Sequence, residues 1–196
     1  MSEHECPGLS DSYGDEFVSL YEKYEKEIPN LEKINARSLM SKIIEAQIET
    51  GQPYMLYKDS INNKSNQKNI GVIKSSNLCA EIVEYSDKSE TSVCNLASIA
   101  LPKFIKKSNK AKTKEYDYKE LYKTAKLATK NLDEVIDINF YPTDKTEKSN
   151  SKHRPIGLGI QGLADVFFEL EIAYDSDKAK EVNKLIFETI YFGALE

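Results

Sequence analysis

Three polar side chains that could do chemistry stand at every second position of one short segment, "SNLCAEIVEYS". They are Asn77, Cys79 and Glu81. In an extended segment, residues two apart point to the same face, about 6.6 Å apart, so the spacing predicts that all three share one face. An amide can orient a polar ligand, a thiol can do redox chemistry, and a carboxylate can remove a proton. The pattern therefore predicts a catalytic row.

The positions of the histidines bear on whether Cys79 could act as a hydrolytic nucleophile. A hydrolytic cysteine nucleophile needs a histidine beside it. The chain has only His4 and His153, and neither segment shows a sign of that role. The pattern therefore favours thiol redox or thiyl-radical chemistry at Cys79. Spacing alone leaves a second interpretation open, in which the cysteines are small buried hydrophobic residues and Glu81 is a charge at the rim of the fold.

Cys94 lies a short distance further along the chain. The runs 81–86 and 91–101 are rich in Ile, Val, Tyr, Cys and Leu, with turn-forming residues between them. These features would allow 81–86 and 91–99 to pair as a hairpin about the turn at 86–89. In such a hairpin Cys94 would lie within about two residues of the position opposite Cys79. The spacing does not decide whether both thiols face the same cavity.

Composition excludes several classes of protein. Hydrophobic residues make up 40% of the 196 residues and charged residues 30%, as in ordinary soluble globular proteins. A net charge of −5 argues against a nucleic-acid surface, and no run of about 18 apolar residues could span a membrane. Three cysteines without a Cys-x-x-Cys pair predict neither a disulfide framework nor a structural zinc site. They fit a reducing, cytoplasmic compartment.

Apolar periodicity predicts the elements that must position these residues. Helices are expected at 15–27, from the N-cap Asn35 to Thr50, at 117–138, and from about residue 175 onward. The other expected elements are a short strand beginning at Pro53, polar loops at 62–69, 106–114 and 141–153, and a glycine-rich strand that passes into a helix within 154–170. Strands that alternate with helices indicate an α/β architecture.

Two further features bear on function. Gly157, Gly159 and Gly162 have the Gly-x-Gly-x-x-Gly spacing, but no acidic residue about 20 positions on completes a dinucleotide site, so we do not expect one. The apolar pattern of the last helix reaches Glu196 without a cap or a polar tail, which predicts truncation within an element.

Several segments in order resemble the catalytic (large) subunit of class I ribonucleotide reductase. The resemblance is carried by "SSNLCAEIVEYS", "VCNLASIAL" and "HRPIGLGIQGLADVF", and it extends through "CPGLSDSYGDEF", "ETGQPYMLYKDSINNKSNQ" and "NKLIFETIYFGALE". It covers nearly the whole chain and weakens around 106–114 and 143–151. The long third segment favours class I over a vitamin-B12-dependent reductase, and an anaerobic glycyl-radical reductase fits less well.

The resemblance implies a fold and a domain assignment. Residues 1–196 would be part of a ten-stranded α/β barrel, whose finger loop carries Asn-x-Cys-x-Glu into the centre. The N-terminal effector domain, the later part of the barrel and the C-terminal tail would be absent. A closed barrel interior would shield a sulfur radical from water.

The resemblance also implies a role for each residue of the site. Cys79 would become the thiyl radical that removes the 3′ hydrogen of a ribonucleotide, and Glu81 would take the proton of the 3′ hydroxyl. Asn77 would hydrogen-bond the sugar or the intermediate. Cys94 would be one half of a redox-active disulfide, whose other cysteine lies outside this sequence.

Cofactors and partners follow from the same resemblance. No cofactor or metal is expected within this segment, because the metal-containing small subunit supplies the radical and ATP or deoxynucleotide effectors bind elsewhere. The expected partners are that small subunit, a second large subunit, thioredoxin or glutaredoxin, and a ribonucleoside diphosphate substrate, with no nucleic acid and no membrane. The isolated chain is expected to be inactive. The alternative is a non-catalytic product of a split or decayed reductase gene that acts only as an assembly module.

Other residues that could suggest chemistry are expected to be structural. Cys6 is interpreted as a packed or partly exposed thiol. His153 and Arg154 are expected to form a structural turn rather than a phosphate site. The tyrosines Tyr54, Tyr57, Tyr141 and Tyr191 are interpreted as packing residues rather than members of a radical relay.

Overall fold

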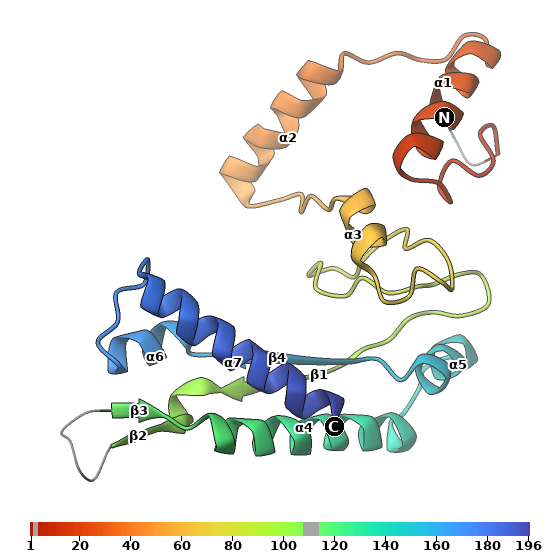
Figure 1. Ribbon diagram of the computed structural model, residues 1–196. Helices are drawn as coiled ribbons and strands as arrows, with labels where there is room; N and C mark the ends of the chain where they lie inside the picture. The colour runs from red at the N-terminus through yellow and green to blue at the C-terminus, as the bar shows by residue number, and fades with distance from the viewer. Residues whose placement is uncertain (2–3, 108–113) are drawn as a thin grey trace. The chain divides into compact units, whose positions relative to one another are not determined.

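The structure, a computed structural model, describes residues 1, 4–107 and 114–196. These residues form two compact units, Met1–Ser92 and Val93–Glu196, and each unit is described by itself. In Figure 1 the first unit runs from red to yellow-green and the second from green to blue. Most of the predicted polar loop at 106–114 lies outside the described residues.

The first unit contains three helices joined by irregular segments. They are α1 (Gly14–Glu27), α2 (Ala36–Thr50) and α3 (Lys58–Lys64). The predictions of α1 and α2 are confirmed, and α2 has the expected ends. The side chain of Asn35 accepts a hydrogen bond from the Ser38 amide at 2.9 Å, and Gly51 ends the helix in the left-handed region with φ 76°.

The predicted strand at Pro53 is wrong. Residues 54–57 are irregular, and α3 begins at Lys58. A strand needs a neighbour for its backbone groups, whereas α3 is anchored by side chains: Lys58 Nζ donates to the carbonyls of Ser10 and Ser12 at 2.6 and 2.9 Å. Asp59 accepts a hydrogen bond from the Gly14 amide at 3.0 Å. The loop predicted at 62–69 consequently begins within α3.

The second unit is built on two parallel strands, β1 (Asn95–Ala100) and β4 (Ile156–Gln161), paired from Asn95 with Ile156 to Ala100 with Gln161. The chain between them contains η1 (Leu101–Phe104), the antiparallel pair β2 (Ile105–Lys107) and β3 (Lys114–Tyr116), α4 (Tyr118–Ile138) and α5 (Asp144–His153). After β4 come α6 (Leu163–Glu169) and α7 (Asp177–Leu195). This is a β-α-β crossover, the usual way to join parallel strands.

Most predictions for this unit are confirmed. Both α4 and α7 begin after side-chain caps, at Asp117 and Ser176, and the glycine-rich strand does pass into a helix. The loop predicted at 141–153 is wrong, because α5 occupies most of it. Thr143 and Thr146 cap each other at its start in a capping box. The helix is polar almost throughout, so it carries no apolar periodicity to reveal it.

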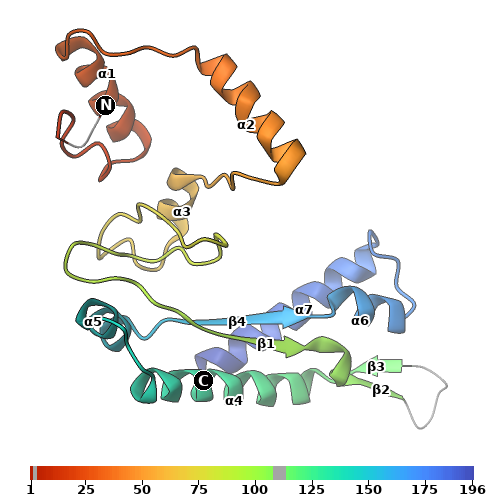
Figure 2. The same cartoon turned by 180° about the vertical axis from the view of Figure 1, so that it is seen from behind.

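The core of this unit lies on one side of the two strands. Figures 1 and 2 show β1 and β4 side by side, with α7 in front of them in the first view and behind them in the second. The buried residues of the core come from β1, η1, α4, α6 and α7. They are Ile99, Leu101, Phe104, Leu121, Ala125, Val166, Phe167, Ala179, Val182, Ile186 and Ile190. Leu158 and Ile160 of β4 pack against this cluster. The opposite face of the strands is open: Leu96, which points to it, is 57% exposed.

The α/β class is confirmed, and the finer expectation of a closed barrel is not seen in the described residues. There, β1 pairs with β4 and β2 with β3, in two separate two-stranded sheets. The predicted hairpin of 81–86 with 91–99 is wrong as well. Its turn forms, with the Asp87 amide donating to the Glu90 carbonyl at 2.9 Å, but β1 pairs in parallel with β4 instead. Parallel pairing on a helix-covered sheet buries the apolar residues of β1 better than a hairpin with one irregular leg. Among the described residues, no helix is long and apolar enough to cross a membrane.

Candidate active site

The row of Asn77, Cys79 and Glu81 lies on a tight turn, not on an extended strand as predicted. The Ala80 amide donates to the Asn77 carbonyl at 3.1 Å, and Ala80 has φ 64° in the left-handed region. A turn of this kind reverses the chain at Leu78 and Cys79, so the alternation of an extended segment does not apply. Asn77 favours the turn because its side-chain oxygen accepts the Ile82 amide at 3.0 Å.

The turn nevertheless brings two of the three predicted side chains together. Asn77 Nδ2 donates to Glu81 Oε1 at 2.7 Å, in an exposed position. The same Asn77 amide thus orients the carboxylate with its nitrogen while its oxygen binds the backbone. A carboxylate oriented in this way keeps its second oxygen for a substrate proton.

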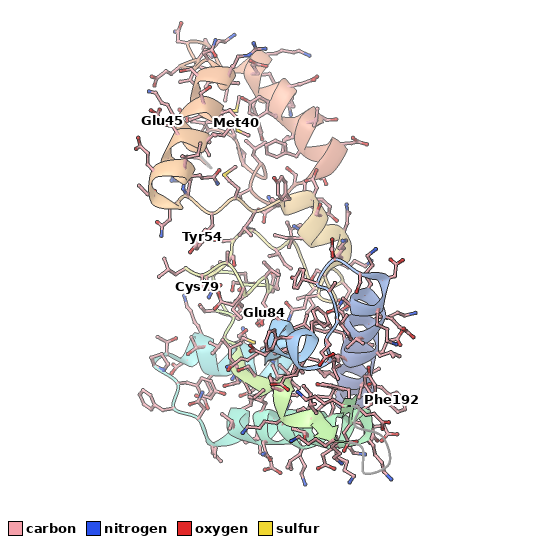
Figure 3. All side chains as sticks on the ribbon, turned by 90° about the vertical axis from the view of Figure 1, so that its left-hand side faces the viewer. Met40, Glu45, Tyr54, Cys79, Glu84 and Phe192 are labelled. Carbon is pink, nitrogen blue, oxygen red and sulfur yellow. The ribbon has the colours of Figure 1, made fainter. Side chains whose placement is uncertain are left out.

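Cys79 lies at the tip of this turn and is exposed, without a disulfide. Figure 3 labels it on the loop of the first unit. Below the tip, Ser76 Oγ donates to the Ile82 carbonyl at 2.6 Å and closes the neck of the loop. The turn thus carries an exposed thiol two residues before an oriented carboxylate. These are groups that can take part in hydrogen-atom and proton transfer.

Cys94 belongs to the second unit and directly precedes β1. It is partly exposed, and its Sγ lies 3.9 Å from the Asn95 carbonyl oxygen. A Cβ added to Gly157, on the neighbouring strand, would lie 3.4 Å from Cys94 Sγ and 2.5 Å from Leu96 Cδ2. Because residues two apart on a strand share a face, Cys94, Leu96 and Ser98 all point to the face opposite the core. The two cysteines thus lie on separate units, Cys79 on an exposed turn and Cys94 on an open sheet face.

The predictions for Cys6 and Arg154 fit the structure. Cys6 is buried at 1% exposure, as a packed thiol. Arg154 ends α5 in the left-handed region, and its guanidinium donates to the carboxylates of Asp133 and Asp137, each at 2.7 Å. The guanidinium lowers the pKa of Asp137. Its charge is therefore used to tie the start of β4 to α4, as expected of a structural turn rather than a phosphate site.

The tyrosine interpretation is only partly right. Tyr141 is structural: its hydroxyl donates to the Ile136 carbonyl at 2.7 Å and accepts from Asn150. Tyr54, Tyr57 and Tyr191 are exposed by 58%, 76% and 68%, so they are not packing residues in this chain. The side chains point outward because the segment 54–57 has no strand neighbour and Tyr191 lies on the outer side of α7.

Sequence reasoning missed two side chains that support the candidate loop, Asn62 and Gln67. Asn62 is 1% exposed and hydrogen-bonds both backbone groups of Ile73, and Gln67 accepts the Tyr85 amide. The sequence feature that could have revealed them is the high content of side-chain amides in "NNKSNQKN", but the same composition is equally typical of a solvated loop. Within the described residues, no three His, Cys, Asp or Glu side chains are grouped as metal ligands.

Comparison with known proteins concerns the chain as a whole and shows its family. The family model described as "Ribonucleotide reductase, barrel domain" matches residues 1–196. The chain is 55% identical over 196 residues to a ribonucleoside-diphosphate reductase large subunit of Plasmodium falciparum, covering 100% of this chain and 24% of the relative. It is 55% identical over 195 residues to the large chain of Neurospora crassa, covering 100% and 21%. It is 53% identical over 191 residues to large chain 2 of Saccharomyces cerevisiae, covering 97% and 22%.

The match is therefore complete for this chain and partial for its relatives. The chain spans about a quarter of the length of the curated large subunits that it matches. A family model that covers every residue, together with identities above one half, is far more specific than any one motif. The chain belongs to the ribonucleotide reductase large-subunit family, within its barrel domain.

Proposed function

We propose that this chain is the part of a ribonucleotide reductase large subunit that carries the radical-forming cysteine and reduces ribonucleoside diphosphates to deoxyribonucleoside diphosphates. One observation carries the proposal: an exposed thiol, Cys79, stands at the tip of a turn whose two ends are an asparagine and a glutamate joined at 2.7 Å. Names of relatives such as the Plasmodium falciparum large subunit support the same reaction.

The reaction assigns a step to each side chain. A thiyl radical at Cys79 removes the 3′ hydrogen atom of the ribose, and Glu81 accepts the proton of the 3′ hydroxyl. The 2′ hydroxyl leaves as water with a proton from one of two thiols. Together the two thiols supply two electrons, that proton and the hydrogen that replaces the hydroxyl, and Glu81 returns its proton to the 3′ oxygen. Cys94 is one of these thiols and becomes half of a disulfide. The 3′ hydrogen then returns from Cys79 to the sugar, which regenerates the thiyl radical.

The open face of the β1–β4 sheet supports the role of Cys94. In an α/β barrel the helices cover the outside, so the face without helices is the inner one. Cys94 points to the face opposite α4 and α7, together with Leu96 and Ser98. We propose that β1 and β4 are two of the ten strands of a barrel and that the 77–81 turn is the tip of its finger loop.

The remaining parts of the reaction come from outside this chain. A small, radical-generating subunit supplies the radical, a second large subunit completes a dimer, and thioredoxin or glutaredoxin reduces the disulfide at Cys94. ATP and deoxynucleotide effectors bind to other regions of the large subunit. The reaction takes place in the cytoplasm, and the 196-residue chain on its own is inactive because the partner of Cys94 lies elsewhere.

The proposal is tested in a full-length large subunit that carries this segment, assayed with its small subunit. Cys79→Ser and Glu81→Gln are expected to lower the formation of deoxyribonucleotide at least 1,000-fold, roughly the scale of removing a group that acts in the chemical step. Cys6→Ala is the control, because that thiol is buried at 1% exposure and has no role in the proposed reaction, and it should keep most of the activity. A Cys79→Ser enzyme with more than a tenth of the wild-type rate would contradict the proposal.

A further inference from the structure

The loop that carries Cys79 is supported by side chains rather than by a sheet. Its ascending leg, 71–77, and its descending leg, 81–87, contain no strand, so neither leg has a ladder of backbone hydrogen bonds. The contacts at the tip and neck lie within the loop itself and do not fix it to any other element. Something else must therefore hold the base of the loop, where Ile73 and Tyr85 lie.

Asn62 of α3 holds the ascending leg. Its Oδ1 accepts the Ile73 amide at 2.7 Å, and its Nδ2 donates to the Ile73 carbonyl at 3.0 Å. Nδ2 also donates to the Lys58 carbonyl at 3.0 Å, which fixes the direction of the amide. Both Asn62 and Ile73 are buried, at 1% and 2% exposure. One side-chain amide thus replaces the strand that would otherwise pair with Ile73.

Gln67 holds the descending leg from the segment that directly follows α3. Its Oε1 accepts the Tyr85 amide at 2.7 Å. The Tyr85 ring then lies over Gly71, where an added Cβ would fall within 3.1 Å of three ring atoms. The two legs are thereby brought together at the base. Next to this contact, Val83 and Glu84 line a cleft of about 500 Å³ with residues of α3, including Ser60 and Ile61.

We propose that Asn62 and Gln67 are positioning residues of the reductase reaction, which set where the Asn77–Cys79–Glu81 turn stands relative to the substrate. The inference rests on the proposed function of that turn. The chain from Ile73 to Tyr85 is tied at its two ends to Asn62 of α3 and to Gln67, which follows α3. Lys74, next to Ile73, adds an exposed ion pair with Asp11. The printed side-chain bonds of the tip, by contrast, lie within the loop. A displacement of the base of the loop therefore displaces Cys79 at its tip.

The expected effect is large because hydrogen-atom transfer requires close approach. A misplacement of about 1 Å in a reacting group can lower a rate roughly 100-fold even when the mutation is far from the chemistry. Loss of one clamp leaves the loop tied at the other end, so we expect a fall in kcat of about 10- to 100-fold. The fold as a whole should remain intact in Gln67 variants, because that side chain is only partly buried. Asn62 is buried at 1% exposure, so its variants test the fold more severely.

The first experiment uses Gln67→Ala and Gln67→Glu in the full-length large subunit, assayed with its small subunit. The alanine variant loses the acceptor for the Tyr85 amide, and the glutamate variant keeps it. We expect kcat to fall at least tenfold in Gln67→Ala and to stay within twofold of wild type in Gln67→Glu. Hydrogen–deuterium exchange should rise in the peptide 73–85 and stay unchanged in α4 and α7.

The second experiment tests the donor of the other clamp with an isosteric variant. Asn62→Asp keeps an acceptor for the Ile73 amide but turns a carboxylate toward the carbonyls of Ile73 and Lys58. We expect a loss of kcat of at least tenfold together with faster exchange in 73–85. Should this variant fold poorly, the Gln67 pair still decides the question.

The outcomes separate this inference from the proposed function. If Cys79→Ser is inactive but Gln67→Ala keeps wild-type kcat, the positioning inference is wrong and the function stands. If Gln67→Ala and Gln67→Glu lose activity equally, or exchange rises throughout the protein, the role of Gln67 is merely structural and the inference is also overturned. If Cys79→Ser remains active, the proposed function itself fails.

Discussion

Gly193 lies where α7 packs tightly against the backbone of α4, and alanine at this position tests that packing. A Cβ built there would lie 2.8 Å from the Tyr122 carbonyl oxygen and 3.3 Å from Ala125 Cβ. The nearest obstacle belongs to the backbone of a helix, so it cannot rotate away. Tyr122 also stacks on the ring of Phe192, with ring centroids 5.8 Å apart, so the tyrosine is held on that side as well.

Two effects oppose each other in Gly193→Ala. Alanine in a helix interior is more favourable than glycine by about 1 kcal/mol. Overpacking in a well-packed site costs about 1–3 kcal/mol, and the contact with a backbone oxygen points to the upper part of that range. We therefore expect the variant to lower the free energy of unfolding by about 1–2 kcal/mol, against the direction of helix propensity.

The assay is urea unfolding of the 196-residue chain, followed by far-ultraviolet circular dichroism. Ala194→Gly serves as the control for propensity at the neighbouring, less buried position, and it should cost about 1 kcal/mol. If Gly193→Ala instead raised the free energy of unfolding by about 1 kcal/mol, propensity would have outweighed packing. The close approach of α7 to α4 would then be refuted as a constraint on this unit.

The remaining predictions concern Cys94 and the turn that precedes it. Gly157→Ala in the full-length enzyme should slow turnover several-fold with little change in thermal stability, because the exposed end of the Leu96 side chain can rotate away from the new methyl group but then crowds Cys94. The rate should recover in the double variant Gly157→Ala/Leu96→Ala. Failure to recover would point to a backbone effect. The pKa of Asp87 is lowered to about 2, chiefly because the Ser89 amide donates to its carboxylate. Its stabilisation of the turn is therefore complete above a pH of about 4 and is lost as the pH falls toward 2. After correction for the intrinsic pH dependence of exchange, amide exchange in the turn should accelerate over that window in the wild type and stay constant in Asp87→Asn. An equal response in both proteins would contradict the assignment.

Sequence alone determined the elements whose stability is local. The helix from the Asn35 cap to Gly51, the helix α4 and the strand that passes into α6 all carry their start, period and stop within the segment itself. The candidate residues Asn77, Cys79 and Glu81 were also accessible, because residue types and order are sufficient to identify a family.

Only the tertiary structure decided how these residues are held. The turn at Asn77 replaced the expected strand because its side chain binds the backbone of Ile82. Asn62 and Gln67 are polar residues in a polar segment, so no periodicity distinguishes a clamp from a solvated loop. Parallel pairing of β1 depended on β4, about 60 residues further along the chain. Such contacts join groups distant in sequence, and the pattern of one segment carries no record of its partner.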